Sequence, residues 1–152
     1  MKIYDPTRAA YSGLFPRKNC FFCDTAVIQR QECTRFAFRH WHVLVNQYPY
    51  MDGNVMLVPK RHRVALARLS EGEWNEFPRA LIDVEHVLGE LFRTRSFNVG
   101  INVGKNSGRS ITHLHWQIIP RQKKNHSVVG ILADIEVITL APATLKKRLS
   151  KK

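Results

Sequence analysis

The sequence predicts an α+β protein, in which an antiparallel sheet packs against one main helix. Two patterns support this class. Short β-branched and apolar runs recur between polar, Pro and Gly turns, and one long stretch instead repeats its apolar residues every three or four positions. With 152 residues, 44% of them hydrophobic, the chain can bury one substantial core but not two. We therefore treat residues 1–152 as a single domain with a basic C-terminal tail at about 146–152.

The expected strands are short, and in the sequence they lie both before and after the expected main helix. They cover residues 27–28, 36–38, 43–45, 55–58, 97–103 and 111–119. A shorter helix is expected at 64–69. The apolar pattern after Val128 does not distinguish a strand from a helix.

The main helix should begin near Ser70. Ser70 and Glu73 have the spacing of a capping box, in which each side chain accepts a hydrogen bond from the other residue's backbone. Apolar residues from Trp74 to Leu91 then continue at helical spacing, so this helix should cover one face of the sheet. Pro78 fits such a helix only near its first turns or with a kink.

The last expected strand carries an unusual polar face. Strict alternation places His113, His115 and Gln117 on one side, with Leu114 and Trp116 on the other. Two imidazoles and an amide facing one way, opposite hydrophobic side chains, are typical of an active-site wall. Alternation alone fits equally well with two surface histidines on a half-buried strand.

A glycine-rich loop leads directly into this histidine segment. Gly104 and Gly108 allow backbone amides to approach an anion, and Lys105 and Arg109 add positive charge to the same loop. A glycine loop after a strand is weak support by itself, because most such loops are plain hairpin connections. Followed at once by a His-x-His segment, it predicts a phosphate-binding site beside a candidate nucleophile.

Taken together, these motifs resemble those of the histidine triad family. The residues that carry the resemblance are Asn102, Gly104, Gly108, Ser110, His113 and His115, with Asn46–Tyr50 and Pro59–His62 upstream. The resemblance implies a five-stranded antiparallel sheet with one main helix, and a two-fold homodimer that joins two sheets into one of ten strands. One position departs from the pattern: Gln117 stands where most members have a third histidine. The branch with dinucleoside polyphosphate phosphorylases and galactose-1-phosphate uridylyltransferases also has glutamine there.

The same resemblance implies roles for individual residues. His115 would attack the α-phosphorus of a nucleotide through Nε2, with its Nδ1–H held by a main-chain carbonyl. Gln117 can hydrogen-bond but cannot titrate, so anionic acceptors should be preferred over water. Ser110 would join the catalytic groups at the α-phosphate. The expected nucleotide and phosphate ligands are Asn46 at the ribose, and Asn102, Lys105, Gly108 and Arg109 near the phosphates.

A metal site is the second expectation. Cys20 and Cys23 have the spacing of half a zinc site, and the resemblance adds His62 and His113 as the other two ligands. Two thiolates and two imidazoles suit tetrahedral zinc, and a closed four-ligand site would be structural. The alternative is a pair of buried cysteines without a metal. Cys33 is expected to be a core residue.

The charge balance points to anionic ligands. The chain has 24 Lys and Arg against 12 Asp and Glu, a formal net charge of +12, which favours phosphate-rich ligands and leaves nucleic acid open as a partner. No apolar run approaches the roughly 20 residues of a membrane helix. The first residues lack the apolar stretch of a secretory signal, so we expect a cytoplasmic location.

These observations favour a nucleotidyl transferase or hydrolase acting at the α-phosphate of a nucleotide polyphosphate. The preferred version is phosphorolysis or hydrolysis of a dinucleoside polyphosphate such as diadenosine tetraphosphate. One alternative is a zinc-stabilised nucleotide-binding or nucleic-acid-binding protein with little turnover. Another is a DNA-adenylate hydrolase resembling aprataxin, against which the missing third histidine counts.

Overall fold

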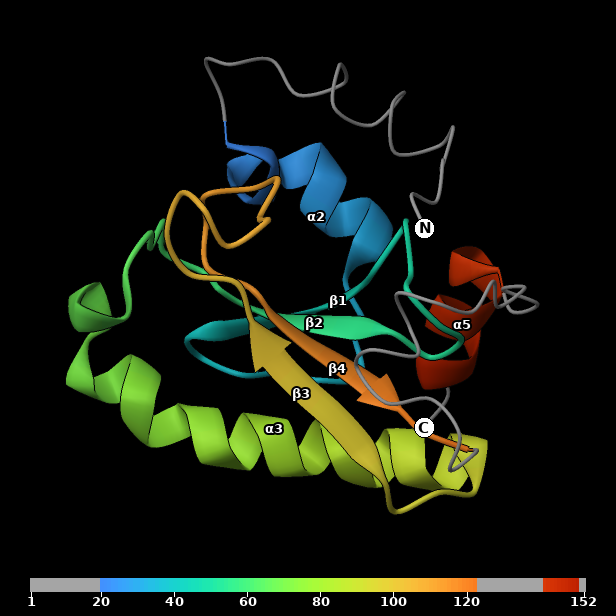
Figure 1. Cartoon of the computed structure of the whole chain (residues 1–152). Coiled ribbons are helices and arrows are strands. Elements are labelled where there is room, and N and C mark those ends of the chain that lie inside the picture. Colours follow the sequence, from blue (N-terminus) through green and yellow to red (C-terminus); the bar gives the residue numbers. More distant parts are fainter. Residues whose placement is uncertain (1–19, 123–140, 151–152) are drawn as a thin grey trace.

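A computed structural model of the chain describes residues 20–122 and 141–150. Its elements in order are η1 (Phe21–Cys23), α2 (Thr25–Gln31), β1 (Trp41–Val45), β2 (Val55–Pro59), η2 (Leu66–Arg68), α3 (Glu71–Phe92), β3 (Phe97–Ile101), β4 (Trp116–Pro120) and α5 (Pro142–Leu149). The strands form one antiparallel sheet in the order β1-β2-β4-β3. Helix α3 covers one face and α2 lies over the other (Figure 1). The α+β class is therefore confirmed.

The inner strand β2 is buried along its whole length, because both faces of the sheet are covered at this point. The turn that brings β2 back along β1 contains Gly53, whose φ of +84° suits glycine. A Cβ at this position would lie 2.5 Å from Pro120 and 2.6 Å from Phe92. Only glycine lets the turn approach β4 and the end of α3 this closely.

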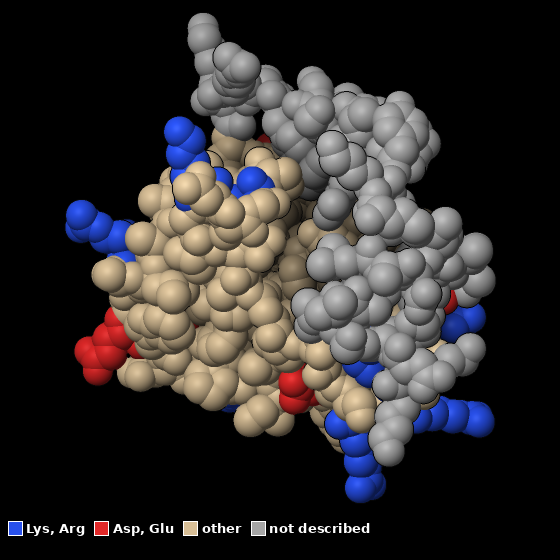
Figure 2. Space-filling view, in the orientation of Figure 1, with Lys and Arg blue, Asp and Glu red and all other residues tan. Residues whose placement is uncertain are grey.

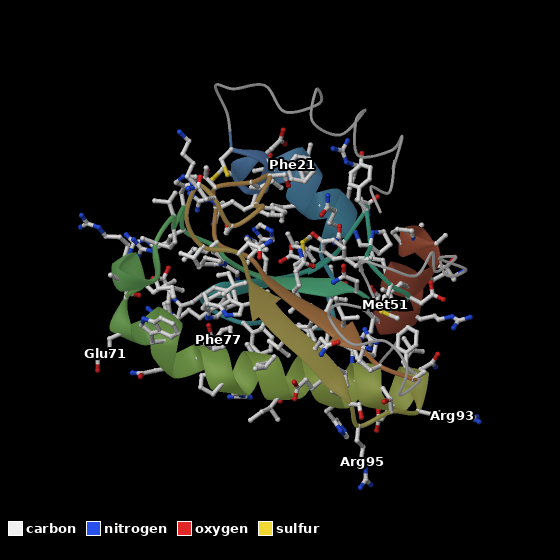
Figure 3. All side chains as sticks on the ribbon, in the orientation of Figure 1. Phe21, Met51, Glu71, Phe77, Arg93 and Arg95 are labelled. Atoms are coloured by element: carbon white, nitrogen blue, oxygen red, sulfur yellow. The ribbon has the colours of Figure 1, made fainter. Side chains whose placement is uncertain are left out.

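Each face of the sheet has its own apolar cluster. Leu114, Trp116 and Ile118 belong to the larger cluster beneath α3, where the Trp116 and Phe77 ring centroids are 4.9 Å apart. Figure 3 shows Phe77 between α3 and the sheet. The smaller cluster on the α2 face consists of Phe22, Ile28, Leu44, Met56, Val58 and Ile111. The alternation expected at residues 113–118 therefore does separate the hydrophobic side chains from the histidines.

Helix α3 begins as predicted. The Ser70 hydroxyl accepts a hydrogen bond from Glu73 N at 3.3 Å, and the Glu73 carboxylate accepts one from Ser70 N at 2.6 Å. Pro78 lies inside the helix, seven residues after its first residue. The helix ends at Phe92, and its C-cap residue Arg93 has a left-handed φ of 52°.

The predictions for several elements are wrong. Residues 27–28 lie in α2 rather than in a strand, because Asp24 caps this helix by accepting from Ala26 N at 2.8 Å. Residues 36–38 are irregular, and on that edge of the sheet Glu32 makes only an isolated bridge with Leu44. The sheet of the described residues therefore has four strands, where the family resemblance implies five. Among the helices of residues 20–122 and 141–150, none has the length and apolar character of a membrane-spanning segment.

Other elements are shorter than the sequence predicted. Strand β3 ends at Ile101 and β4 begins only at Trp116, so both histidines precede β4 rather than lying in it. The short helix expected at 64–69 is the single 3-10 turn η2. In the region of uncertain type after Val128, the structure describes α5, and residues 123–140 lie outside the described part. The end of the basic tail, residues 151–152, also lies outside it.

Candidate active site

The four expected metal ligands converge from three separate segments. The 3-10 turn η1 supplies Cys23 and its N-cap is Cys20. The segment after β2 supplies His62, and the segment before β4 supplies His113. Their ligand atoms all lie within 4.8 Å of one another. Cys20 Sγ is 3.4 Å from His113 Nδ1, and Cys23 Sγ is 3.3 Å from His62 Nδ1. Ligands about 2.0 to 2.3 Å from a tetrahedral zinc ion lie roughly 3.3 to 3.8 Å from each other, so these two pairs have the spacing of zinc ligands, and two thiols with two imidazoles are a donor set that suits zinc.

The protonation of His113 also suits a ligand. Its Nε2 lies 2.9 Å from the Pro59 carbonyl and donates its proton there, which leaves Nδ1 unprotonated towards the thiols. Burial lowers the pKa of His113 to about 4, so the imidazole is neutral. Burial also raises the pKa of Cys20 to about 11. A bound cation would favour the thiolate over this buried thiol.

His115 is held in one tautomer. Its Nδ1 donates to the His113 carbonyl oxygen at 2.9 Å, so the lone pair of the neutral ring is on Nε2. Burial lowers the pKa of His115, and the positive charge of Arg109 lowers it further. The Phe22 ring packs against it with centroids 5.4 Å apart. The result is a fixed, neutral imidazole with a nucleophilic nitrogen.

Gln117 belongs to a group of three side-chain amides. Its Oε1 accepts from Asn54 Nδ2 at 2.8 Å and from Asn46 Nδ2 at 3.4 Å. Asn46 and Asn54 are themselves joined at 2.8 Å, and both are buried. The sequence analysis singled out Asn46 and Gln117 but missed Asn54. The available signal was a polar residue between Gly53 and an all-apolar strand.

Two glycines of the loop that precedes the histidines have a positive φ. Gly104 and Gly108 have φ of +90° and +81°, and Ser107 Oγ donates to the Gly104 carbonyl at 2.8 Å. Arg109 lies across the loop and donates to the Thr112 carbonyl at 3.2 Å. The remaining expected ligands, Asn102, Lys105 and Ser110, lie on the loop with exposed side chains. The loop is therefore accessible to a solute anion.

An ion pair that the sequence analysis missed supports the histidine segment. Arg63 Nε donates to both carboxylate oxygens of Glu73 at 3.0 Å, and Glu73 is fully buried. The Arg63 carbonyl accepts from Leu114 N at 2.7 Å. The start of α3 is thereby connected, through Arg63, to the residue between His113 and His115.

Fold and site define an α+β protein with a fixed histidine beside a glycine loop and a four-residue metal-ligand cluster. The chain belongs to the HIT domain family, whose family model matches residues 29–124. It is 32% identical over 98 residues to an AP-4-A phosphorylase of Mycobacterium tuberculosis, covering 64% of this chain and 50% of the relative. It is 34% identical over 89 residues to a bis(5'-adenosyl)-triphosphatase of Saccharomyces cerevisiae, covering 58% and 43%.

The solved structures agree on the fold. A Zn-bound histidine triad family protein from Mycobacterium smegmatis superposes with a TM-score of 0.67 at 16% identity, covering 87% of this chain and 91% of that one. In sequence, the chain spans about half the length of the curated relatives named above.

Proposed function

We propose that this protein transfers nucleotidyl groups from dinucleoside polyphosphates through a covalent intermediate on His115. The observation that carries the proposal is the hydrogen bond from His115 Nδ1 to the His113 carbonyl, which leaves Nε2 as the nucleophile. Relatives named as an AP-4-A phosphorylase and a bis(5'-adenosyl)-triphosphatase support this substrate class.

The first step would form one bond and break another. The Nε2 lone pair attacks the α-phosphorus, and the bond from that phosphorus to the bridging oxygen breaks. From diadenosine tetraphosphate, ATP leaves with the electron pair and an adenylyl group remains on His115. No proton has to leave His115, because the Nδ1–H stays bonded to the His113 carbonyl and stabilises the positive imidazolium that forms.

The second step would return the nitrogen lone pair. An acceptor oxygen attacks the phosphorus and the phosphorus–nitrogen bond breaks. Inorganic phosphate gives ADP and water gives AMP. Water must lose a proton, which Gln117 cannot take, whereas an anionic acceptor needs no base. We therefore favour phosphorolysis over hydrolysis.

Other groups would bind the substrate. The loop containing Gly108, Arg109 and Ser110 would contact the α-phosphate, with Lys105 and Asn102 beside it, since amides, hydroxyls and cations stabilise the charge that develops there. Asn46 would contact the ribose through its Oδ1, which also accepts from Tyr48 N.

The cluster of Cys20, Cys23, His62 and His113 would hold a structural zinc ion, which would supply no open coordination position for chemistry. The metal would instead join η1 to the segment that carries His115 and so keep the imidazole in position. The expected cytoplasmic location stays a prediction.

The reaction is tested by product analysis. The protein is incubated with diadenosine tetraphosphate, with and without inorganic phosphate, and the nucleotides are separated. We expect ATP in both cases, with ADP as the second product when phosphate is present. Equal amounts of AMP with and without phosphate, and no ADP, would show an ordinary hydrolase.

The net charge of +12 favours a second candidate, a binding protein for nucleic acid. Among the described residues on the face drawn in Figure 2, however, Lys and Arg lie mostly around the margin and do not merge into one stripe. The same experiment separates the candidates: absence of turnover on every nucleotide, with DNA or RNA binding that weakens steeply with salt, would favour the binding protein.

A further inference from the structure

The orientation of the Gln117 amide is determined by a chain of hydrogen bonds that begins at the backbone. Asn46 Oδ1 accepts from Tyr48 N at 2.9 Å. Because a backbone N–H can only donate, the oxygen of Asn46 must face Tyr48, and its Nδ2 must face Asn54. The atom of Asn54 that receives this donor, 2.8 Å away, is therefore Oδ1.

Asn54 is fixed independently from its other side. Its Oδ1 also accepts from Tyr50 N at 3.3 Å, and its Nδ2 lies 3.2 Å from the Val55 carbonyl and 3.5 Å from the Ile118 carbonyl. Reversing the amide would place its oxygen against two carbonyls and its NH₂ group against two donors. Asn54 is fully buried, so water cannot compensate for this mismatch.

The orientation of Asn54 determines that of the Gln117 amide. Asn54 Nδ2 is a donor and lies 2.8 Å from the Gln117 side chain, so the atom facing it must be the acceptor Oε1. The NH₂ group of Gln117 must then point away from Asn54. Gln117 lies two residues beyond His115 on the same face, opposite Trp116 and Ile118, which pack beneath α3.

The geometry points to Asn54 as a positioning residue that keeps the Gln117 NH₂ group, rather than its oxygen, directed at the phosphate of the bound nucleotide. This inference rests on the proposed function and deepens it. The two orientations of a glutamine amide have nearly the same shape, but one offers an anion a donor and the other offers an acceptor that repels it. A donor already oriented for the developing charge needs no reorganisation during the reaction.

A double-mutant cycle tests this role. In Asn54→Asp the carboxylate keeps the acceptor for Asn46 and Tyr50 but replaces the donor 2.8 Å from Gln117 by a second acceptor. This closer contact outweighs the 3.4 Å contact between Asn46 Nδ2 and Gln117, so Gln117 should reverse and present its oxygen. We expect kcat on diadenosine tetraphosphate to fall by about tenfold to a hundredfold, with KM changed less than about threefold. In a Gln117→Ala background the same substitution should change kcat by less than about twofold, because no amide is left to orient.

Two controls accompany the cycle. Asn75→Asp makes the same chemical change on the exposed surface of α3 and should leave kcat unaltered. If Asn54→Asp fails to fold, Asn54→Ala replaces it; this variant frees Gln117 to take either orientation and should also lower kcat only when Gln117 is present. An equal loss of kcat in both backgrounds would overturn the inference and show a merely structural role.

A second measurement does not depend on turnover. In ¹⁵N-labelled protein, the side-chain NH₂ signals of Gln117, assigned by their loss in Gln117→Ala, should shift on titration with AMP. They should not shift in Asn54→Asp. If the wild-type protein turns over no dinucleoside polyphosphate, the proposed function fails, but this titration still tests the role of Asn54. The inference is overturned if AMP does not shift the Gln117 signals, or if it shifts them equally in both proteins.

Discussion

At the scale of single residues, what a side chain near His115 can do depends on which of its atoms carry hydrogen. His115 donates from Nδ1 and so has its lone pair on Nε2, while His113 donates from Nε2 and so has its lone pair on Nδ1. Each proton is fixed by a main-chain carbonyl. Two histidines separated by one residue thereby receive opposite tautomers, one suited to nucleophilic attack and the other to metal binding.

Replacing Gln117 by histidine should change the products. An imidazole at this position can accept a proton from water, so Gln117→His should divert the adenylyl group from phosphate to water and raise the AMP to ADP ratio. The ratio is measured with diadenosine tetraphosphate at fixed phosphate concentration. Gln117→Asn, which shortens the side chain but adds no base, is the control and should not raise the ratio. An unchanged ratio in Gln117→His would show that Gln117 does not determine the acceptor.

At the scale of elements, the metal cluster joins η1 to the segment after β2, which contains His62, and to the segment before β4, which contains His113. We expect purified protein to contain about one zinc ion per chain, because a four-ligand site binds tightly and couples to folding. Cys20→Ser should lower both the zinc content, measured by mass spectrometry, and the melting temperature. Cys33→Ala is the matched control: Cys33 is buried outside the cluster, so this variant should retain its zinc. A zinc-free wild-type protein of undiminished stability would contradict the metal site.

The ion pair at the start of α3 should make stability depend on pH. Burial tends to raise the pKa of Glu73, but hydrogen bonds from Arg63 and Ser70 outweigh it, and the pKa lies below its ordinary value. The stabilisation is therefore present at neutral pH and is lost as the pH falls below about 4.5, through the lowered pKa of the folded state.

Glu73→Gln should remove this dependence and leave Arg63 without its partner. We expect a loss of about 1 to 3 kcal/mol in the free energy of unfolding at pH 7, with a smaller difference at pH 3. Denaturant unfolding at the two pH values checks this. Asp83→Asn, which breaks the exposed pair with Arg79, should cost less than about 0.5 kcal/mol. An equal loss for Glu73→Gln at both pH values would contradict the assignment.

At the scale of the whole molecule, the sheet leaves β3 at its edge with one side unpaired among the described strands. The strand also exposes Val99, and Val103 is exposed just beyond its end. An exposed apolar edge strand favours pairing with a second copy. We predict a homodimer through β3, and Val99→Lys should shift it towards monomer in light scattering after gel filtration. Ile82→Lys, at an exposed position on α3, is the control. A wild-type monomer at micromolar concentration would contradict this prediction.

The sequence predicted those parts of the molecule that depend on local patterns. The capping box at Ser70 and the separation of a polar from an apolar face around His115 both follow from neighbouring residues. It failed at Val27 and Ile28, whose β-branched side chains suggested a strand, because Asp24 caps a helix there and tertiary packing overrides propensity.

Parts of the candidate site could not be predicted for a different reason. The contact of Asn54 with Gln117 joins residues 63 positions apart, and that of Arg63 with Glu73 joins residues 10 positions apart. Neither contact follows from a local sequence pattern. The metal cluster was expected only because a family resemblance supplied its second half. The structure brings these four side chains together through η1 and the two ends of the neighbouring strands β2 and β4.

The central claim is that His115 carries the nucleotidyl group, and intact-mass measurement tests it most directly. The protein is mixed with diadenosine tetraphosphate in the absence of phosphate, where Gln117 should make release to water slow, and is then weighed by mass spectrometry. We predict a mass increase of one adenylyl group on the wild-type chain. His115→Ala should show no increase and lose turnover by orders of magnitude, yet still bind AMP. An adduct that persists in His115→Ala, or undiminished turnover by that variant, would contradict the account.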